Sequence, residues 1–258
     1  MTTCAEQRGA AVISFWMTAL ALGQTTCERI GMTDITSVEA PAVIVLGERK
    51  GTWPDLLRAD RIVGRLASKG EVTLALESVL PEHQSVLDRY AQGGVQMRDL
   101  PELLQWNQWW GFSWSDYQGL VTSADRGATV VAAGAPMQPR PEDASLALPP
   151  GYPHLLAQAT GEHAMPVALE STFAQNVAWM DQRIAQTALD AWDGQGWLVI
   201  VTDRLRVEGG LGVAWQAQRM TPAPVHAFVL ADGESPCFSG DRVWRPSLIT
   251  VVSDALNL

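Results

Sequence analysis

The chain has 258 residues, of which 18 are Lys or Arg and 28 are Asp or Glu, so its formal net charge is -10. Apolar residues make up 47% and charged residues 18%, which excludes a disordered or fibrous protein and suits one large domain or two small ones. An acidic balance without a basic cluster argues against binding to nucleic acid or to an anionic membrane surface. The 11 tryptophans are unusual, because tryptophan packs cores but also forms walls for flat apolar ligands.

Residues 1–26 are predicted to be a signal peptide. Arg8 precedes an apolar run from Gly9 to Leu22, which is shorter than the ~20 residues of a bilayer span. Small residues at Ala21 and Gly23 offer a cleavage site. The alternative is a buried N-terminal helix of the domain. The signal-peptide interpretation predicts export to the periplasm or the outer membrane.

Cleavage at this site would remove Cys4 and leave Cys27 and Cys237. These two cysteines could pair in an oxidising compartment, although sequence cannot give the distance between them. Cys27 could instead carry a lipid anchor, but Gln24, Thr25 and Thr26 lack the small apolar character of a lipoprotein motif. No CxxC pair is present, so structural zinc is not expected.

From Ala40 onward, short apolar runs alternate with amphipathic stretches, a pattern typical of a parallel sheet covered by helices. Residues 133–153 are rich in proline and are predicted to be a long loop or an insert. The fold class is therefore predicted to be α/β, with a mostly parallel central sheet flanked by helices, a Pro-rich insert and extra helices. Strands are predicted at 41–48, 72–76, 128–132, 197–201 and, as the last one, 225–230, and helices at 53–66, 82–90, 115–126 and 171–192.

The common dinucleotide, nucleotide and serine-hydrolase motifs are absent from the sequence. None of the four histidines lies at the i, i+4 spacing of a helical metal pair. Ligands of open α/β sheets bind at the carboxyl ends of the strands, which draws attention to Glu48, Glu77 and the segment 202–206. Glu48 and Glu77 could converge on one pocket, or they could pair with Lys50 and Arg206 as a salt-bridge cluster.

Five segments of the chain are distinctive in their order and spacing: VIVLGERK (43–50), ALESVLPEHQSVLDRY (75–90), WNQWWGFSWSDYQGLV (106–121), VEGGLGVAWQA (207–217) and GDRVW (240–244). Together they resemble the ChaN-like haem-binding uptake proteins of the wider Tiki/TraB/erythromycin-esterase superfamily. The resemblance implies one ChaN-like α/β domain over residues 40–258.

The chain departs from the family pattern at two histidines. Gly47 and Glu48 match the family's G-E-x-H turn, but Lys50 stands where the histidine would be, and Arg206 replaces the histidine of the later G-x-x-H. Glu77 matches the glutamate after the second strand, and residues 181–185 match the D-x-x-M-A motif, with Ile184 for methionine. Because Lys and Arg are charged donors that do not ligate a cation, the pocket of Glu48, Lys50, Glu77 and Arg206 is predicted to be vestigial and to hold no catalytic metal. The competing hypothesis is a Lys50 nucleophile activated by burial.

Haem binding, as the resemblance implies, needs an apolar wall, an axial ligand and cations for the propionates. Trp106, Trp109, Trp110 and Trp114 are candidates for the wall, or else form a packing cluster. Tyr152, His154, His163 and Met165 are the candidate axial ligands, with Arg140 as the candidate propionate partner.

The predicted function is therefore non-enzymatic haem binding in the cell envelope for haem or iron uptake. A homodimer and an outer-membrane haem receptor are the expected partners. The competing functions are a divergent hydrolase of the esterase branch and an interaction scaffold that binds no small molecule. A hydrolase should still hold a metal or a nucleophile, and a scaffold should expose its tryptophans.

Overall fold

The computed structural model describes residues 27–135, 140–141, 146–160, 167–230 and 242–244. Its centre is a seven-stranded sheet in which every pair of neighbouring strands is parallel, in the order β1-β7-β6-β2-β5-β3-β4. The predicted α/β fold with a parallel sheet is confirmed. The strands are β1 (Glu28–Ile30), β2 (Ala42–Glu48), β3 (Val72–Leu76), β4 (Thr129–Ala132), β5 (Trp197–Asp203), β6 (Val225–Leu230) and β7 (Arg242–Trp244).

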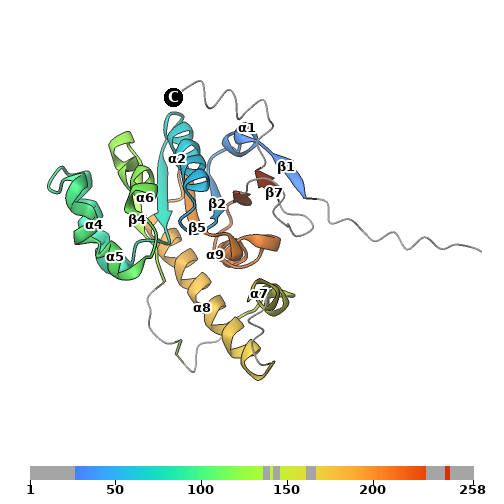
Figure 1. Ribbon diagram of the computed structural model, residues 1–258. Helices are drawn as coiled ribbons and strands as arrows, with labels where there is room; N and C mark the ends of the chain where they lie inside the picture. The colour runs from blue at the N-terminus through green and yellow to red at the C-terminus, as the bar shows by residue number, and fades with distance from the viewer. Residues whose placement is uncertain (1–26, 136–139, 142–145, 161–166, 231–241, 245–258) are drawn as a thin grey trace, which may run out of the picture.

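Helices cover both faces of the sheet, and the long helix α8 extends past the end of the sheet toward which β3 points (Figure 1). Each inner strand is apolar throughout because its alternate side chains pack against opposite layers. In β2, Ile44 and Leu46 join the core under α2 and α6, while Val43 and Val45 join the core under α8 and α9. The helices are α1 (Met32–Thr36), α2 (Trp53–Ala67), α3 (Gln84–Ala91), α4 (Leu100–Leu103), α5 (Trp106–Trp109), α6 (Trp114–Val121), α7 (Tyr152–Thr160), α8 (Val167–Ala191) and α9 (Val213–Met220).

The structure differs from the sequence prediction at one edge of the sheet, where β1 and β7 lie. The prediction of residues 225–230 as the last strand is wrong, because β7 pairs in parallel with both β6 and β1. β1 and β7 have three residues each, too few to give a periodic signal. Residues before position 40 also contribute to the core, since Ile30 and Ile35 are buried in it.

The chain order creates a switch point between β2 and β5, which lie side by side. α2 leads from β2 to β3 on one face, and α9 leads from β5 to β6 on the other face. The two connections therefore leave their strands in opposite directions, which opens a crevice at the carboxyl ends of such strands. This is the edge of the sheet at which Glu48 and Asp203 end β2 and β5.

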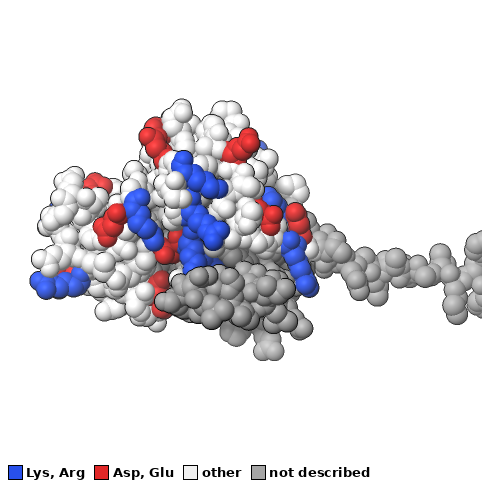
Figure 2. All heavy atoms as spheres, turned by 90° about the horizontal axis from the view of Figure 1, so that it is seen from above, with Lys and Arg blue, Asp and Glu red and all other residues white. Residues whose placement is uncertain are grey.

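Basic and acidic side chains are interspersed on the surface. Figure 2 shows Lys and Arg side chains in the middle of the face seen from above, with Asp and Glu side chains around them. On α2, Arg58 pairs with the fully buried Asp55 at 3.0 Å, and Asp60 pairs with Arg126.

None of the helices in the described part of the chain combines the length and apolar character that a membrane span requires.

Candidate functional site

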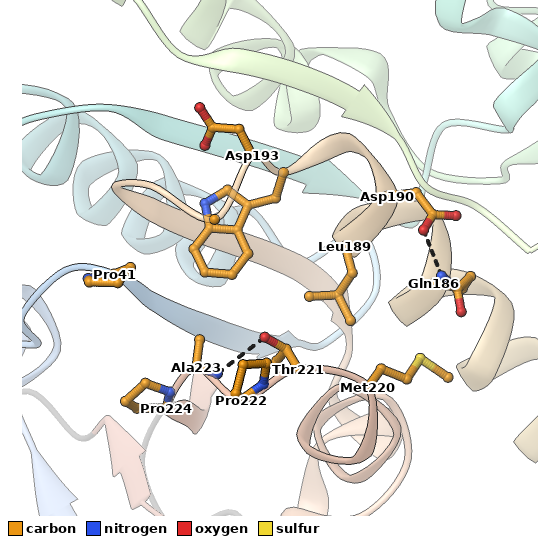
Figure 3. A pocket seen from close by; sticks show the side chains of 12 residues that line it. Pro41, Gln186, Leu189, Asp190, Asp193, Met220, Thr221, Pro222, Ala223 and Pro224 are labelled. Atoms are coloured by element: carbon orange, nitrogen blue, oxygen red, sulfur yellow. Dashed lines mark hydrogen bonds between the residues drawn. The ribbon is translucent and has the colours of Figure 1, made fainter.

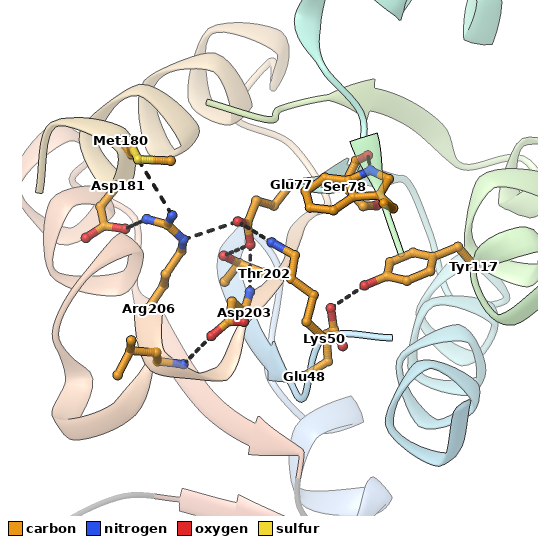
Figure 4. A network of polar contacts seen from close by, with 12 residues as sticks. Glu48, Lys50, Glu77, Ser78, Tyr117, Met180, Asp181, Thr202, Asp203 and Arg206 are labelled. Carbon is orange, nitrogen blue, oxygen red and sulfur yellow. Dashed lines mark hydrogen bonds and ion pairs between the residues drawn. The ribbon is translucent and has the colours of Figure 1, made fainter. Parts of the chain in front are cut away.

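The predicted pocket residues meet at the switch point, where Glu77 accepts from two cations (Figure 4). Lys50 Nζ lies 2.8 Å and Arg206 Nε 3.2 Å from Glu77 Oε1. The other carboxylate oxygen, Oε2, accepts from Thr202 Oγ1 and from the backbone N–H of Asp203, both at 2.7 Å. Burial raises the pKa of Glu77, but Arg206 and Lys50 outweigh it and lower the pKa to about 2. Glu77 is therefore an ionised carboxylate held between two cations.

Arg206 joins this cluster to the long helix α8. Its guanidinium forms an ion pair with the fully buried Asp181, which also accepts from the Tyr152 hydroxyl. Burial lowers the pKa of Arg206, but Glu77 and Asp181 more than offset this effect and hold it above its usual range. The network thus ties β3, the turn after β5, α8 and α7 together through buried charges.

Glu48 is set apart from the two cations by its hydrogen bonding. Its side chain is 2% exposed, Oε1 accepts from the Tyr117 hydroxyl, and Oε2 has no hydrogen-bond partner in the described structure. Burial raises its pKa to about 8, and the Tyr117 hydrogen bond and Lys50 counteract this only in part. Glu48 and Glu77 therefore share one edge of the sheet, but Glu48 is a neutral acid at pH 7 and Glu77 is ionised.

The tryptophan-rich segment forms mainly a packing cluster. Trp106 is 1% exposed and lies edge-on to Trp114, with ring centroids 5.2 Å apart. Trp110 stacks on Phe112 and donates from Nε1 to the Ser78 carbonyl at 2.7 Å. Trp109, in contrast, is 40% exposed. Of the four residues considered as a haem wall, Trp106 is thus a core residue and Trp109 is a surface residue.

The haem-ligand candidates have different surroundings. Tyr152 begins α7, is fully buried, and donates to Asp181, while burial and Asp181 raise the pKa of its hydroxyl. This geometry disfavours Tyr152 as an axial ligand, because the hydroxyl is enclosed and its phenolate form is suppressed. His154, two residues along α7, is exposed. His163 and Met165 lie outside the described residues.

Arg140, the candidate propionate partner, is half-buried and donates from Nη1 to the Pro141 carbonyl at 3.3 Å.

Cys27 is disulfide-bonded. The other two cysteines of the chain, Cys4 and Cys237, lie outside the described residues. Within the described ranges, no group of three or more His, Cys, Asp or Glu side chains is arranged to hold a metal ion.

A separate open pocket of about 790 Å³ lies at the opposite edge of the sheet (Figure 3). Pro41 and Pro224, which directly precede β2 and β6, line it together with Met220 and the acidic residues Asp190 and Asp193. Neither Tyr152 nor His154, the two axial-ligand candidates among the described residues, lines this pocket. Its acidic rim does not suit the propionates of haem.

Sequence and structure comparisons relate this fold and site to known proteins. The sequence model of the family described as haem-binding uptake, Tiki superfamily, ChaN matches residues 35–140. The fold is similar to that of ChaN of Campylobacter jejuni, described for its cofacial haem binding, with a TM-score of 0.62 and 18% identity over 82% of this chain and 89% of that chain. The resemblance to the ChaN-like proteins is confirmed.

A second solved structure has a similar fold. The type III effector HopBA1 has a TM-score of 0.55 and 9% identity, over 87% of this chain and 97% of its own. None of the curated proteins matches this chain in sequence. At these identities, the two structural matches show a shared fold.

Two residues of the site have no role in the sequence prediction. Tyr117 lies on α6, and its hydroxyl donates to Glu48. Asp181 was noticed only as part of a motif. A signal for it exists, because it interrupts the buried stripe of Ala178, Ala185 and Ala188 on α8, and a buried acid requires a partner.

Proposed function

We propose that this protein binds haem and serves haem uptake in the cell envelope without catalysing a reaction. The observation that carries the proposal is the match of residues 35–140 to the ChaN haem-binding uptake family. The ChaN-like fold supports it, because the solved ChaN structure is described for cofacial haem binding. Cofacial binding places two haems face to face, so a homodimer is the assembly that we propose, with an outer-membrane haem receptor as the source.

His154 is the axial ligand that best suits the geometry. It lies exposed on the first turn of α7, and a neutral imidazole ligates haem iron. Because Tyr152 and Leu155 anchor α7 in the apolar cluster with α8, the helix gives His154 a rigid base. Either His163 or Met165, or the same helix of a second copy, would supply a further contact, and Arg140 would pair with a propionate.

The non-enzymatic part of the proposal rests on Lys50 and Arg206. Both cations are bound to Glu77 and stand where the family pattern has histidines. One observation favours the competing hydrolase function: a neutral Glu48 and an ionised Glu77 at one edge form the kind of carboxyl pair used for acid–base chemistry. Stoichiometric zinc or manganese in the purified protein would favour the hydrolase.

Haemin titration followed by absorption spectroscopy tests haem binding. We expect a saturable spectral shift, and we expect His154→Ala to weaken haemin binding about tenfold or more, since an axial bond contributes at least 1.4 kcal/mol. Tyr152→Phe should leave the affinity unchanged, because its hydroxyl faces Asp181, and His226→Ala on β6 is the matched control. No shift beyond that of an unrelated acidic protein would reject haem and favour the scaffold function. A shift that is insensitive to His154→Ala would keep haem and reject this ligand.

Export is tested by intact-mass measurement after expression in a Gram-negative host. We expect a mature chain beginning near Gln24, and we expect Cys27 to resist alkylation until a reductant is added, because it is disulfide-bonded. A chain that begins at Cys27 with added acyl mass would instead establish a lipid anchor. An unprocessed cytoplasmic chain would refute export.

A further inference from the structure

Glu48 has an unsatisfied hydrogen-bonding position in the interior of the protein. Within the described structure, its Oε2 is buried and has no partner, while Oε1 accepts from Tyr117. Leaving a buried polar atom without a partner costs about 1–3 kcal/mol, so native proteins fill such positions with water or a ligand. The position lies at the switch point between β2 and β5, where α/β proteins bind small molecules.

The groups around this position are donors. Because Oε1 accepts from Tyr117, the acidic proton of Glu48 belongs on Oε2 and points away from Tyr117. The Lys50 ammonium uses one contact for Glu77 and lies 4.5 Å from the centre of the Trp110 ring, which leaves protons for another acceptor. Trp110, whose ring lies beneath Lys50, donates from Nε1 to the backbone carbonyl of Ser78. The buried hydroxyl of Ser78 has no partner within the described residues. A ligand here must therefore offer acceptor atoms.

We propose that the site at Glu48 binds a small carboxylate, which accepts hydrogen bonds from the neutral acid of Glu48 and from the ammonium of Lys50. This proposal is independent of haem binding, and it gives the degenerate pocket a binding role without catalysis.

The charges around Glu48 select a monoanion. Glu77 from β3 and Asp203 from β5 are acidic, Lys50 is the cation beside Glu48, and Tyr117 from α6 is a neutral donor. Lys50 already compensates part of the charge of Glu77, so a dianion such as phosphate would bring an excess of negative charge. A cation is disfavoured because Lys50 and Arg206 already neutralise Glu77.

Binding of a carboxylate requires the proton on Glu48. Two adjacent carboxylates repel each other, whereas an acid and a carboxylate share a proton. The pKa of Glu48 in the ligand-free protein is about 8. The affinity for the carboxylate should therefore be constant below pH 8 and fall about tenfold per pH unit above it. Above pH 8, the binding of each carboxylate should also be accompanied by the uptake of at most one proton from solution.

Acetate is the probe, and the full chain is titrated by calorimetry between about pH 7 and pH 10 in buffers of different ionisation enthalpy. We expect the affinity to decrease at least tenfold over this range, with proton uptake that approaches one per acetate. Glu48→Gln should abolish the pH dependence and the proton uptake, because the amide is a donor at every pH. Lys50→Met should weaken binding about tenfold or more, while Asp193→Asn at the opposite edge should behave like the unaltered protein.

Two results would overturn the proposal. Acetate affinity that does not change across the pH range would show that Glu48 does not hold the ligand. The absence of saturable binding at about 100 mM acetate would show that water alone occupies this position. Circular dichroism of each variant at pH 7 establishes that it is folded, and Glu48→Gln keeps the side-chain shape for this reason.

Discussion

Replacing Glu77 with glutamine should destabilise the protein by about 3 kcal/mol at pH 7. The substitution keeps the size of the side chain but removes the charge that holds Lys50 and Arg206. Both cations are largely buried, with side-chain exposures of 26% and 12%, so they would remain in the interior with less compensation. Urea unfolding followed by fluorescence measures the difference in the free energy of unfolding.

The pH dependence identifies the cause. The pKa of Glu77 is lowered from 4.5 to about 2 by folding, so its contribution is complete above pH 4.5 and is lost as the pH falls through 2. The difference between the protein and Glu77→Gln should therefore shrink as the pH decreases from 5 toward 2. Glu82→Gln, at an exposed glutamate, is the matched control. A difference that stays constant over this range would contradict the ion-pair explanation.

Glu48→Gln should have the opposite dependence on pH. The pKa of Glu48 is raised from 4.5 to about 8, so its contribution to stability is complete below pH 4.5 and is lost as the pH rises to 8. Ionising this buried carboxyl costs up to about 5 kcal/mol at pH 9. Glutamine has no charge to bury and still accepts from Tyr117. The variant should thus gain stability relative to the unaltered protein as the pH rises from 5 to 9.

Unfolding of both proteins at pH 5 and pH 9 provides the measurement, because other titrating groups cancel in the double difference. The variant Tyr117→Phe provides a second test of the pKa of Glu48. It removes the donor to Oε1, so it should raise the pKa of Glu48 further. Parallel stability profiles for Glu48→Gln and the unaltered protein would show that Glu48 is ionised throughout, and would reject the neutral-acid description.

The layout of the site could be predicted because parallel strands deliver the residues that follow them to one edge. Glu48 ends β2 and Glu77 directly follows β3, so the meeting of these two residues required no knowledge of loop geometry. Arg206 lies three residues after the end of β5, on a short 3-10 turn. The partners from the helices could not be predicted in this way. Asp181 and Tyr117 reach the site through the rotation of α8 and α6 about their axes, which depends on packing.

Burial was the property that sequence predicted least well. Tyr152 follows a proline-rich segment, where an exposed position is the usual expectation. Its side chain is instead fully buried and packs α7 against α8. Trp106 and Trp109 occupy one short helix, but only Trp109 faces solvent. Strand β7, the second strand from one edge of the sheet, is likewise specified by its neighbours, β6 and β1, and not by its three residues.

The lysine at position 50 also has a consequence for how the protein depends on its surroundings. A bound metal ion is in exchange with solution, so it stabilises a fold only to the extent that the free ion is available. Lys50 is attached to the backbone and presents its charge to Glu77 at a fixed stoichiometry. Chelators and competing ions cannot remove it. This edge of the sheet would thereby stay intact during metal starvation, when a site built on an exchangeable ion would empty.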